Sequence, residues 1–215
     1  MPNPFIGDNT RIIEWLATRP RGKADPSAPL KIFSAVSMDL LDALRAHRPC
    51  VSYHPRPVPP EKLRAVLSAA RLAPSQYNLQ PWRFVVVQDD ERKRLLAQAS
   101  NRGKLIAEAP AVIVAFAVEE DIPITIGGYI SAYPLDVAVA VDRLRLAATA
   151  EGLGTNWLIE FNEEKVRHVL NVPEGIHPIA VIPIGFPAEG NGGAIPVEDG
   201  RKSTDEIVGW DEYPG

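Results

Sequence analysis

The segment from Arg71 to Val87 (RLAPSQYNLQPWRFVVV) joins a helical pattern to a strand pattern, and two prolines bracket the connection. Because a proline disfavours the α conformation in the residue before it, the helix should end by Ala73 and Gln80 should be extended. Between the prolines lie short polar side chains that suit a flat polar ligand: Ser75, Gln76, Asn78 and Gln80. On composition alone, a plain turn is the more common outcome for such a cluster.

Composition places the chain among ordinary globular proteins. Its 215 residues are enough for one domain with a full core, and its content of 46% hydrophobic and 23% charged residues is normal. A net charge of -4 argues against nucleic acid as the main partner, because phosphate backbones bind basic surfaces. The single cysteine cannot form an internal disulfide, and we find no signal peptide and no apolar run long enough to span a bilayer. We therefore expect a cytoplasmic protein without a membrane partner.

The chain divides at residue 37. Residues 1–37 are expected to form an N-terminal extension, with a short amphipathic helix at 10–18 followed by a proline-rich basic linker. Residues 38–215 are expected to form the main domain. Ser37 is placed to cap a helix starting at Met38, whose apolar residues should face inward: Leu40, Leu41 and Leu44.

Further along, apolar runs predict buried strands at 82–88, whose centre 84–87 is apolar without a break, and at 109–118 and 179–184. Helical patterns cover 60–72, 90–100 and 163–171, and residues 119–134 are expected to be irregular. The longest helix should run from about Leu135 to Glu151, with two apolar faces. One face has Val137, Val141, Leu144 and Ala148, and the other has Leu135, Val139, Leu146 and Ala150. Such a helix belongs either in the core or at a dimer interface.

The string Ala-Pro-Ser-x-x-Asn-x-Gln-Pro-Trp at 73–82 resembles the signature of the nitroreductase family. Further resemblances follow in order: Glu-Ala-Pro at 108–110, Gly-Leu-Gly-x-x-Trp at 152–157, Gly-Phe-Pro at 185–187 and Arg-x-x-x-x-Glu-Ile-Val-x-Trp at 201–210. The resemblance spans about Met38 to Trp210. It implies an α+β three-layer sandwich, with a central mixed, mainly antiparallel sheet flanked by helices. It also implies a homodimer that binds FMN between its subunits.

The resemblance further implies an FMN-dependent oxidoreductase that uses NAD(P)H to reduce nitroaromatics, quinones or similar conjugated small molecules by a ping-pong mechanism. The flavin N5 carries this chemistry, so no catalytic side chain is required. The sequence accordingly contains no paired carboxylates, no metal-ligand spacing, no Ser, His, Asp triad and no Gly-x-Gly-x-x-Gly or Walker loop.

The family pattern also assigns candidate residues. For the flavin ring these are Pro74, Ser75, Gln76 and Asn78, with backbone N–H groups around Leu158, Ile159 and Glu160. For the phosphate and the chain leading to it, they are His47, Arg48, Arg102 (or Lys104), Arg201 and Lys202. Tyr129 and Tyr133 either stack in the substrate pocket or are simply buried aromatics. Glu160 either hydrogen-bonds the ring edge or caps the helix that follows it.

The segment from His47 to Pro59, called the phosphate segment below, departs from the family pattern in two places. Pro49 stands where a serine is usual, and Val51 stands where a basic residue is usual. Ser52 and His54 are nearby substitutes. Two alternatives therefore stay open: a protein that binds flavin or another planar ligand without turnover, and a flavin-dependent dehalogenase or flavin-cleaving relative.

Overall fold

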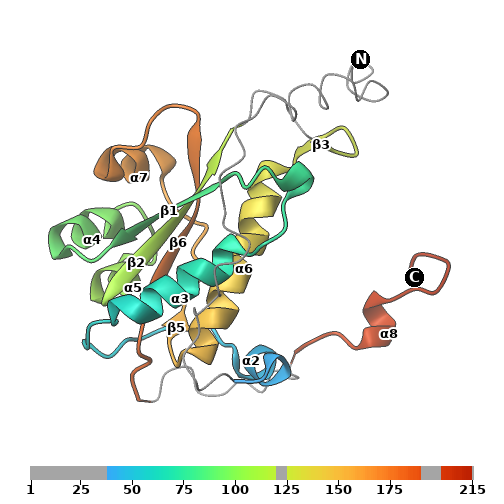
Figure 1. The fold of residues 1–215 in the computed structure, drawn as a ribbon, viewed down its shortest axis with the longest axis horizontal. Coiled ribbons are helices and arrows are strands. Elements are labelled where there is room, and N and C mark those ends of the chain that lie inside the picture. The colour runs from blue at the N-terminus through green and yellow to red at the C-terminus, as the bar shows by residue number, and fades with distance from the viewer. Residues whose placement is uncertain (1–37, 120–124, 190–199, 215) are drawn as a thin grey trace, which may run out of the picture.

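The computed structural model describes residues 38–119, 125–189 and 200–214 (Figure 1). The extension and linker expected at 1–37 lie outside these residues. The helix expected to start at Met38 with Ser37 as its cap starts at Leu40 instead, and its cap is Asp39, whose carboxylate accepts from the Leu41 amide at 2.9 Å. The described helices are α2 (Leu40–Ala46), α3 (Pro60–Arg71), α4 (Asp90–Ala97), α5 (Gly103–Glu108), α6 (Tyr133–Ala150), α7 (Glu163–Leu170) and α8 (Thr204–Ile207). The strands are β1 (Trp82–Val87), β2 (Ala111–Val118), β3 (Thr125–Ile126), β4 (Ile130–Ser131), β5 (Gly154–Thr155) and β6 (Ile176–Gly185).

Four of these strands form an antiparallel sheet in the order β1-β2-β6-β5. Val114 at the centre of β2 pairs with Val85 of β1 on one side and with Val181 of β6 on the other. β2 is buried along seven of its eight residues, as its apolar run predicted. β1 was expected to be an interior strand, but within the described part of the chain it lies at the edge of the sheet. Its side chains still pack on both faces, which explains the unbroken apolar run.

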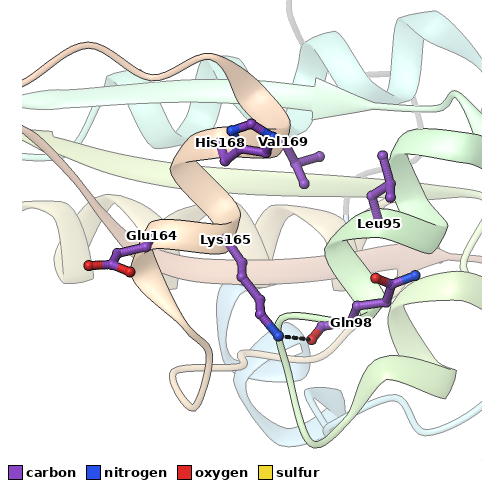
Figure 2. A pocket seen from close by; sticks show the side chains of 6 residues that line it. All are labelled: Leu95, Gln98, Glu164, Lys165, His168 and Val169. Atoms are coloured by element: carbon purple, nitrogen blue, oxygen red, sulfur yellow. Dashed lines mark hydrogen bonds between the residues drawn. The ribbon is translucent and has the colours of Figure 1, made fainter.

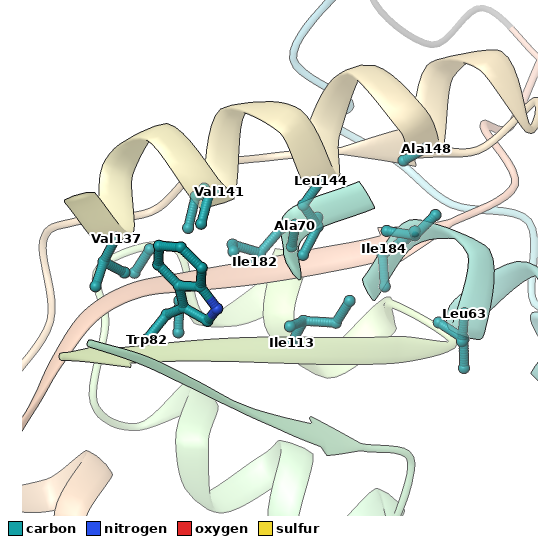
Figure 3. Packing of buried hydrophobic residues seen from close by; sticks show 14 of the residues in the cluster. Leu63, Ala70, Trp82, Ile113, Val137, Val141, Leu144, Ala148, Ile182 and Ile184 are labelled. Carbon is teal, nitrogen blue, oxygen red and sulfur yellow. The ribbon is translucent and has the colours of Figure 1, made fainter. Parts of the chain in front are cut away.

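Helices cover both faces of this sheet (Figure 1). α3 and α6 pack on one face, and α4, α5 and α7 pack on the other. The α6 residues predicted to form one face point at the sheet and are fully buried: Val137, Val141, Leu144 and Ala148 (Figure 3). They meet Ile113 of β2 and Ile182 of β6 in one cluster. Full burial of a side chain such as Leu144 contributes about 1.5–3 kcal/mol. The expected three-layer α+β sandwich is thus confirmed.

The other predicted apolar face of α6 and the apolar face of α2 remain open. Leu135 and Val139 of α6 are 45% and 42% exposed. In α2, Leu40, Leu41 and Leu44 are 65%, 56% and 47% exposed, so the prediction that they face inward is wrong for a single chain. Ala43 is the only buried residue of α2, and its small side chain lets this seven-residue helix lie close against α6. The described chain therefore presents two helices with apolar surface and no covering partner.

Two smaller elements complete the described chain. The segment 119–134, expected to be irregular, contains a two-stranded hairpin of β3 and β4, whose turn uses Gly127 and Gly128 at positive φ. The tail with α8 stands apart from the sandwich (Figure 1), and its Trp210 and Tyr213 are 86% and 94% exposed. Among the described helices, none combines the length and hydropathy needed to cross a bilayer.

Candidate functional site

The proline-bracketed loop folds into a tight and strained turn. A short 3-10 turn at Gln76–Asn78 follows extended Ser75, and three non-glycine residues have positive φ: Tyr77 (48°), Asn78 (57°) and Gln80 (52°). The expectation that Gln80 is extended is therefore wrong. The Gln80 amide donates to the Ser75 hydroxyl at 2.9 Å, and this bond across the loop outweighs the local effect of Pro81. Clustered positive-φ residues of this kind are typical of functional sites.

Side chains of helix α6 hold this loop and the residues before it in place. Asp136 Oδ2 accepts a hydrogen bond from the Gln76 amide at 3.1 Å, and the Arg143 guanidinium donates to the carbonyl of Leu72. Burial raises the pKa of the Asp136 carboxyl, and the Gln76 N–H partly offsets that rise. The anchors leave several side chains at the loop surface exposed: Pro74, Gln76, Tyr77 and Asn78. The loop thus presents polar groups on a backbone that α6 holds in place.

The segment 158–160 lies beside β6, on the side of β6 that faces away from β2. The Leu158 N–H is already used, because it donates to Val181 O at 3.0 Å. Ile159 is 68% exposed, Glu160 is also exposed, and their backbone N–H groups have no partner among the described residues. Of the three predicted backbone donors, Ile159 and Glu160 are thus the two that remain available to a ligand.

Two predictions concern the surroundings of Glu160. Its carbonyl accepts from the Ser100 hydroxyl at 2.9 Å, and Arg102, which bonds the same hydroxyl through its amide, lies beside it. The prediction that Glu160 caps α7 is wrong, since Asn162 occupies the cap and accepts from the Lys165 amide at 2.9 Å. The fold therefore brings Arg102 and Glu160 to one place.

The expected phosphate segment lies against the C-terminal end of α6 and the β5 edge. The Cys50 amide donates to Thr155 O at 2.8 Å, and the Tyr53 hydroxyl donates to Pro183 O at 2.9 Å. The His47 ring turns inward, with Nδ1 2.9 Å from Thr149 Oγ1 and Nε2 buried. Burial lowers the pKa of His47. Arg48 is half-buried and donates to the carbonyls of Arg45 and His47 at 2.6 and 2.7 Å.

The remaining predicted residues are spread out. Arg201 and Lys202 are exposed on the tail, whose helix α8 stands apart from the sandwich (Figure 1). Tyr129 is 78% exposed on the β3–β4 hairpin. Tyr133 begins α6 and packs partly against the core, and burial together with Glu119 and Glu163 raises its pKa.

The contacts that hold the loop and the phosphate segment lie at two separate places along α6. Asp136, which holds the loop, and Thr149, which holds His47, lie near opposite ends of the 18-residue helix α6. At a rise of about 1.5 Å per residue, they are about 20 Å apart along its axis. A hollow of about 330 Å³ between α4 and α7 is lined by none of the predicted residues (Figure 2). Its lining residues are Leu95, Gln98, Glu164, Lys165, His168 and Val169. No cluster of three metal-binding side chains occurs in 38–119, 125–189 or 200–214.

Sequence reasoning missed the residues that support the loop and the segments around it: Ser100, Asp136, Arg143 and Thr149. A signal did exist for two of them. Asp136 and Arg143 are two of only four charged residues on a helix that is otherwise mostly apolar, and a charge in such a place needs a partner.

Comparison with known proteins identifies this arrangement. The model described as "Nitroreductase family" matches residues 44–122 and 98–186, well over half of the chain. The chain belongs to the nitroreductase family. A relative from Thermus thermophilus named NADH dehydrogenase is 32% identical over 185 residues, which cover 71% of this chain and 90% of that protein. This membership makes the chain a flavin oxidoreductase of the nitroreductase kind.

Two further nitroreductase-family likenesses are informative. The solved structure titled FMN-dependent nitroreductase from Clostridium difficile R20291 matches with a TM-score of 0.69 and 27% identity, covering 80% of this chain and 99% of that one. A relative from Thermotoga neapolitana named iodotyrosine deiodinase is 28% identical over 176 residues, covering 70% of this chain and 90% of that protein. The fold is thus shared with a nitroreductase, while the family name alone leaves the acceptor open.

Proposed function

We propose that this chain is an FMN-dependent oxidoreductase that uses NAD(P)H to reduce nitroaromatics, quinones or similar conjugated acceptors as a homodimer. One observation carries the proposal: the loop 75–80, expected to bind the flavin ring, and the segment 47–59, expected to bind the phosphate, lie at opposite ends of α6. A second copy related by a two-fold axis supplies the missing half of each site. The open apolar faces of α2 and α6, described above, provide the surface on which such a copy packs.

The residues present fit FMN. The available N–H groups of Ile159 and Glu160 suit the acceptor edge of a flavin ring, and Arg102 lies close to them. The exposed polar groups of the loop, with Asn78 at their centre, suit the pyrimidine oxygens and nitrogens. Arg48, Arg201 and Lys202 supply positive charge for a phosphate, although the inward ring of His47 offers it no donor in this conformation.

When bound, FMN supplies two-electron chemistry between a nicotinamide and an acceptor. The chain's own tasks are then to hold the ring, to stabilise negative charge on it with backbone N–H groups, and to leave one ring face open. No acid, base or nucleophile on the chain is needed for these tasks.

Spectroscopy tests this function directly. Purified protein with added FMN should retain flavin absorbance after desalting, NAD(P)H should bleach it without oxygen, and a nitroaromatic or quinone should restore it. Protein that neither retains FMN nor quenches its fluorescence would contradict the proposal. Retention of FMN without bleaching by either nicotinamide would favour a binding protein.

Mixed dimers test whether each site draws on two chains. Arg48→Glu and Asn78→Asp are each expected to abolish FMN binding in a homodimer. If one chain supplies Arg48 and its partner supplies Asn78, a heterodimer of the two variants contains one intact site. Random exchange should then restore binding to about one quarter of all sites. Sites built within one chain would restore none.

Reductive dehalogenation is a second candidate, because a relative covering 70% of this chain is named iodotyrosine deiodinase. Product analysis separates the two: release of iodide from an iodophenol under reducing conditions supports dehalogenation, and accumulation of hydroxylamine or hydroquinone supports the first proposal.

A further inference from the structure

The loop at 75–80 requires a conformation that its own sequence resists. Tyr77, Asn78 and Gln80 all have φ near +50°, a region that side chains other than glycine enter at a cost. The bond from the Gln80 amide to the Ser75 hydroxyl closes the loop but does not attach it to the rest of the molecule. The conformation therefore depends on contacts from a neighbouring element.

That element is α6, which contacts the loop through the carboxylate of Asp136. Asp136 lies in the first turn of α6, where the helix dipole favours negative charge. Its Oδ2 accepts the Gln76 amide at 3.1 Å, 60 residues away in sequence. Gln76 directly precedes the first residue of positive φ, so this bond fixes the backbone where it turns.

We propose that Asp136 is a positioning residue that holds the loop 75–80 in its flavin-binding conformation through the Gln76 amide. This inference rests on the proposed function, since the loop is taken as one side of the FMN site. Asp136 acts on the backbone of the loop and touches neither the cofactor nor the acceptor in this role.

Two substitutions isolate the hydrogen bond. Asp136→Ala removes the acceptor, whereas Asp136→Asn keeps an acceptor oxygen at the same place and loses the charge. Glu91→Ala, an exposed acidic residue in the first turn of α4, serves as the matched control. With Gln76→Pro the amide itself is removed. Ser75 already has φ -143° and ψ 157°, which is the conformation that a following proline requires.

Hydrogen exchange of flavin-free protein gives the first readout. The amides of 75–80 should exchange faster in Asp136→Ala than in the wild type, while Asp136→Asn and Glu91→Ala should resemble the wild type. The affinity for FMN, measured by quenching of its fluorescence, gives the second. Asp136→Ala should weaken binding by roughly tenfold, as expected for loss of one hydrogen bond that holds the loop, and Asp136→Asn, which keeps the acceptor oxygen, should recover most of it. In a Gln76→Pro background, Asp136→Ala should change the affinity no further.

The outcomes are distinct. If Asp136→Ala exchanges and binds FMN as the wild type does, the inference is wrong. It is equally wrong if a folded Asp136→Asn loses as much affinity as Asp136→Ala, or if the effects of Asp136→Ala and Gln76→Pro are additive. Should the wild type itself bind no FMN, the proposed function fails, whatever the exchange rates show.

Discussion

The Nδ1 atom of His47 lies 2.9 Å from the hydroxyl oxygen of Thr149, a contact that ties the end of α2 to the last turns of α6. Thr149 Oγ1 is also 3.1 Å from the carbonyl of Arg145. A carbonyl only accepts, so the hydroxyl donates to it and receives the His47 Nδ1–H. The buried Nε2 has no partner in the part of the chain that the structure describes. This arrangement suits a neutral imidazole with its proton on Nδ1.

A pH dependence of stability follows from this contact. Burial, and then the charge of Arg145, lower the pKa of His47, while Asp142 raises it and Arg48 lowers it. Because the unfolded chain then binds a proton more readily than the folded chain, the free energy of unfolding should fall as the pH drops below about 6.5. Urea titrations at pH 7.5 and 5.5 should show a smaller loss for His47→Gln than for the wild type. Equal losses would contradict the neutral assignment.

Leu41 on the exposed face of α2 should control assembly. A charge at this position would be buried without a partner in the proposed dimer, so Leu41→Asp should give a single subunit in light scattering. Stability of the isolated chain should change by less than about 0.5 kcal/mol, because the side chain is 56% exposed there. Leu95→Asp, on the exposed surface of α4, is the matched control and should remain dimeric. A Leu41→Asp dimer of wild-type affinity would place the interface elsewhere.

Arg201 should contribute to binding of the FMN phosphate, with the tail that carries it placed at an FMN site. Arg201→Ala should weaken FMN binding by roughly tenfold or more, the usual scale for one charge-assisted bond to a phosphate. Arg94→Ala removes an exposed arginine on α4 and should have no effect. Binding of riboflavin, which lacks the phosphate, should be equal in both variants. Equal FMN affinity of the two variants would remove Arg201 from the site.

The carboxylate of Glu160 should lower the flavin midpoint potential, because it disfavours the extra negative charge of the reduced ring. Neutral Glu160→Gln should therefore raise the potential by on the order of tens of millivolts. Glu164→Gln, an exposed position on α7, controls for the change in net charge. An unchanged potential in a redox titration of Glu160→Gln would place the carboxylate away from the ring.

Gly154 permits the phosphate segment to pack against β5. A Cβ atom there would lie 2.6 Å from Cys50 Sγ and 2.8 Å from Cys50 Cβ, which forces a shift of that segment. Gly154→Ala should cost about 1–3 kcal/mol of stability in urea unfolding and also reduce FMN affinity. Gly152→Ala meets no atom within 4 Å but has φ +73°, so it should cost about 1 kcal/mol and leave FMN affinity unchanged.

Local pattern was sufficient for the core. The apolar run at 109–118 and the 3.6-residue spacing of Val137, Val141 and Leu144 predicted a buried strand and a buried helix face, because each depends on neighbours in sequence. The same spacing in α2 marked Leu41 as apolar without saying whether its own chain covers it. A single sequence does not distinguish a core from an interface.

Hydrogen bonds that the residue pattern does not reveal account for most of the other errors. The hydrogen bond from the Gln80 amide to Ser75, and not the proline that follows, sets the backbone conformation of Gln80. The bond from Gln76 to Asp136 spans 60 residues, so no local pattern encodes it. Glu160 was offered as a cap of α7, two residues before the actual cap Asn162, because the start of a helix is uncertain by a residue or two from sequence alone.

Helix α6 also sets a limit on how this chain can diverge. A residue inserted between its two anchors would move Thr149 about 1.5 Å further away and swing it by about 100° around the axis relative to Asp136. The contacts of Asp136 and Thr149 could not then form together, and in the proposed homodimer both sites would be affected. Natural variants should accordingly keep the number of residues from 136 to 149 constant, while gaining or losing residues freely near Gly127.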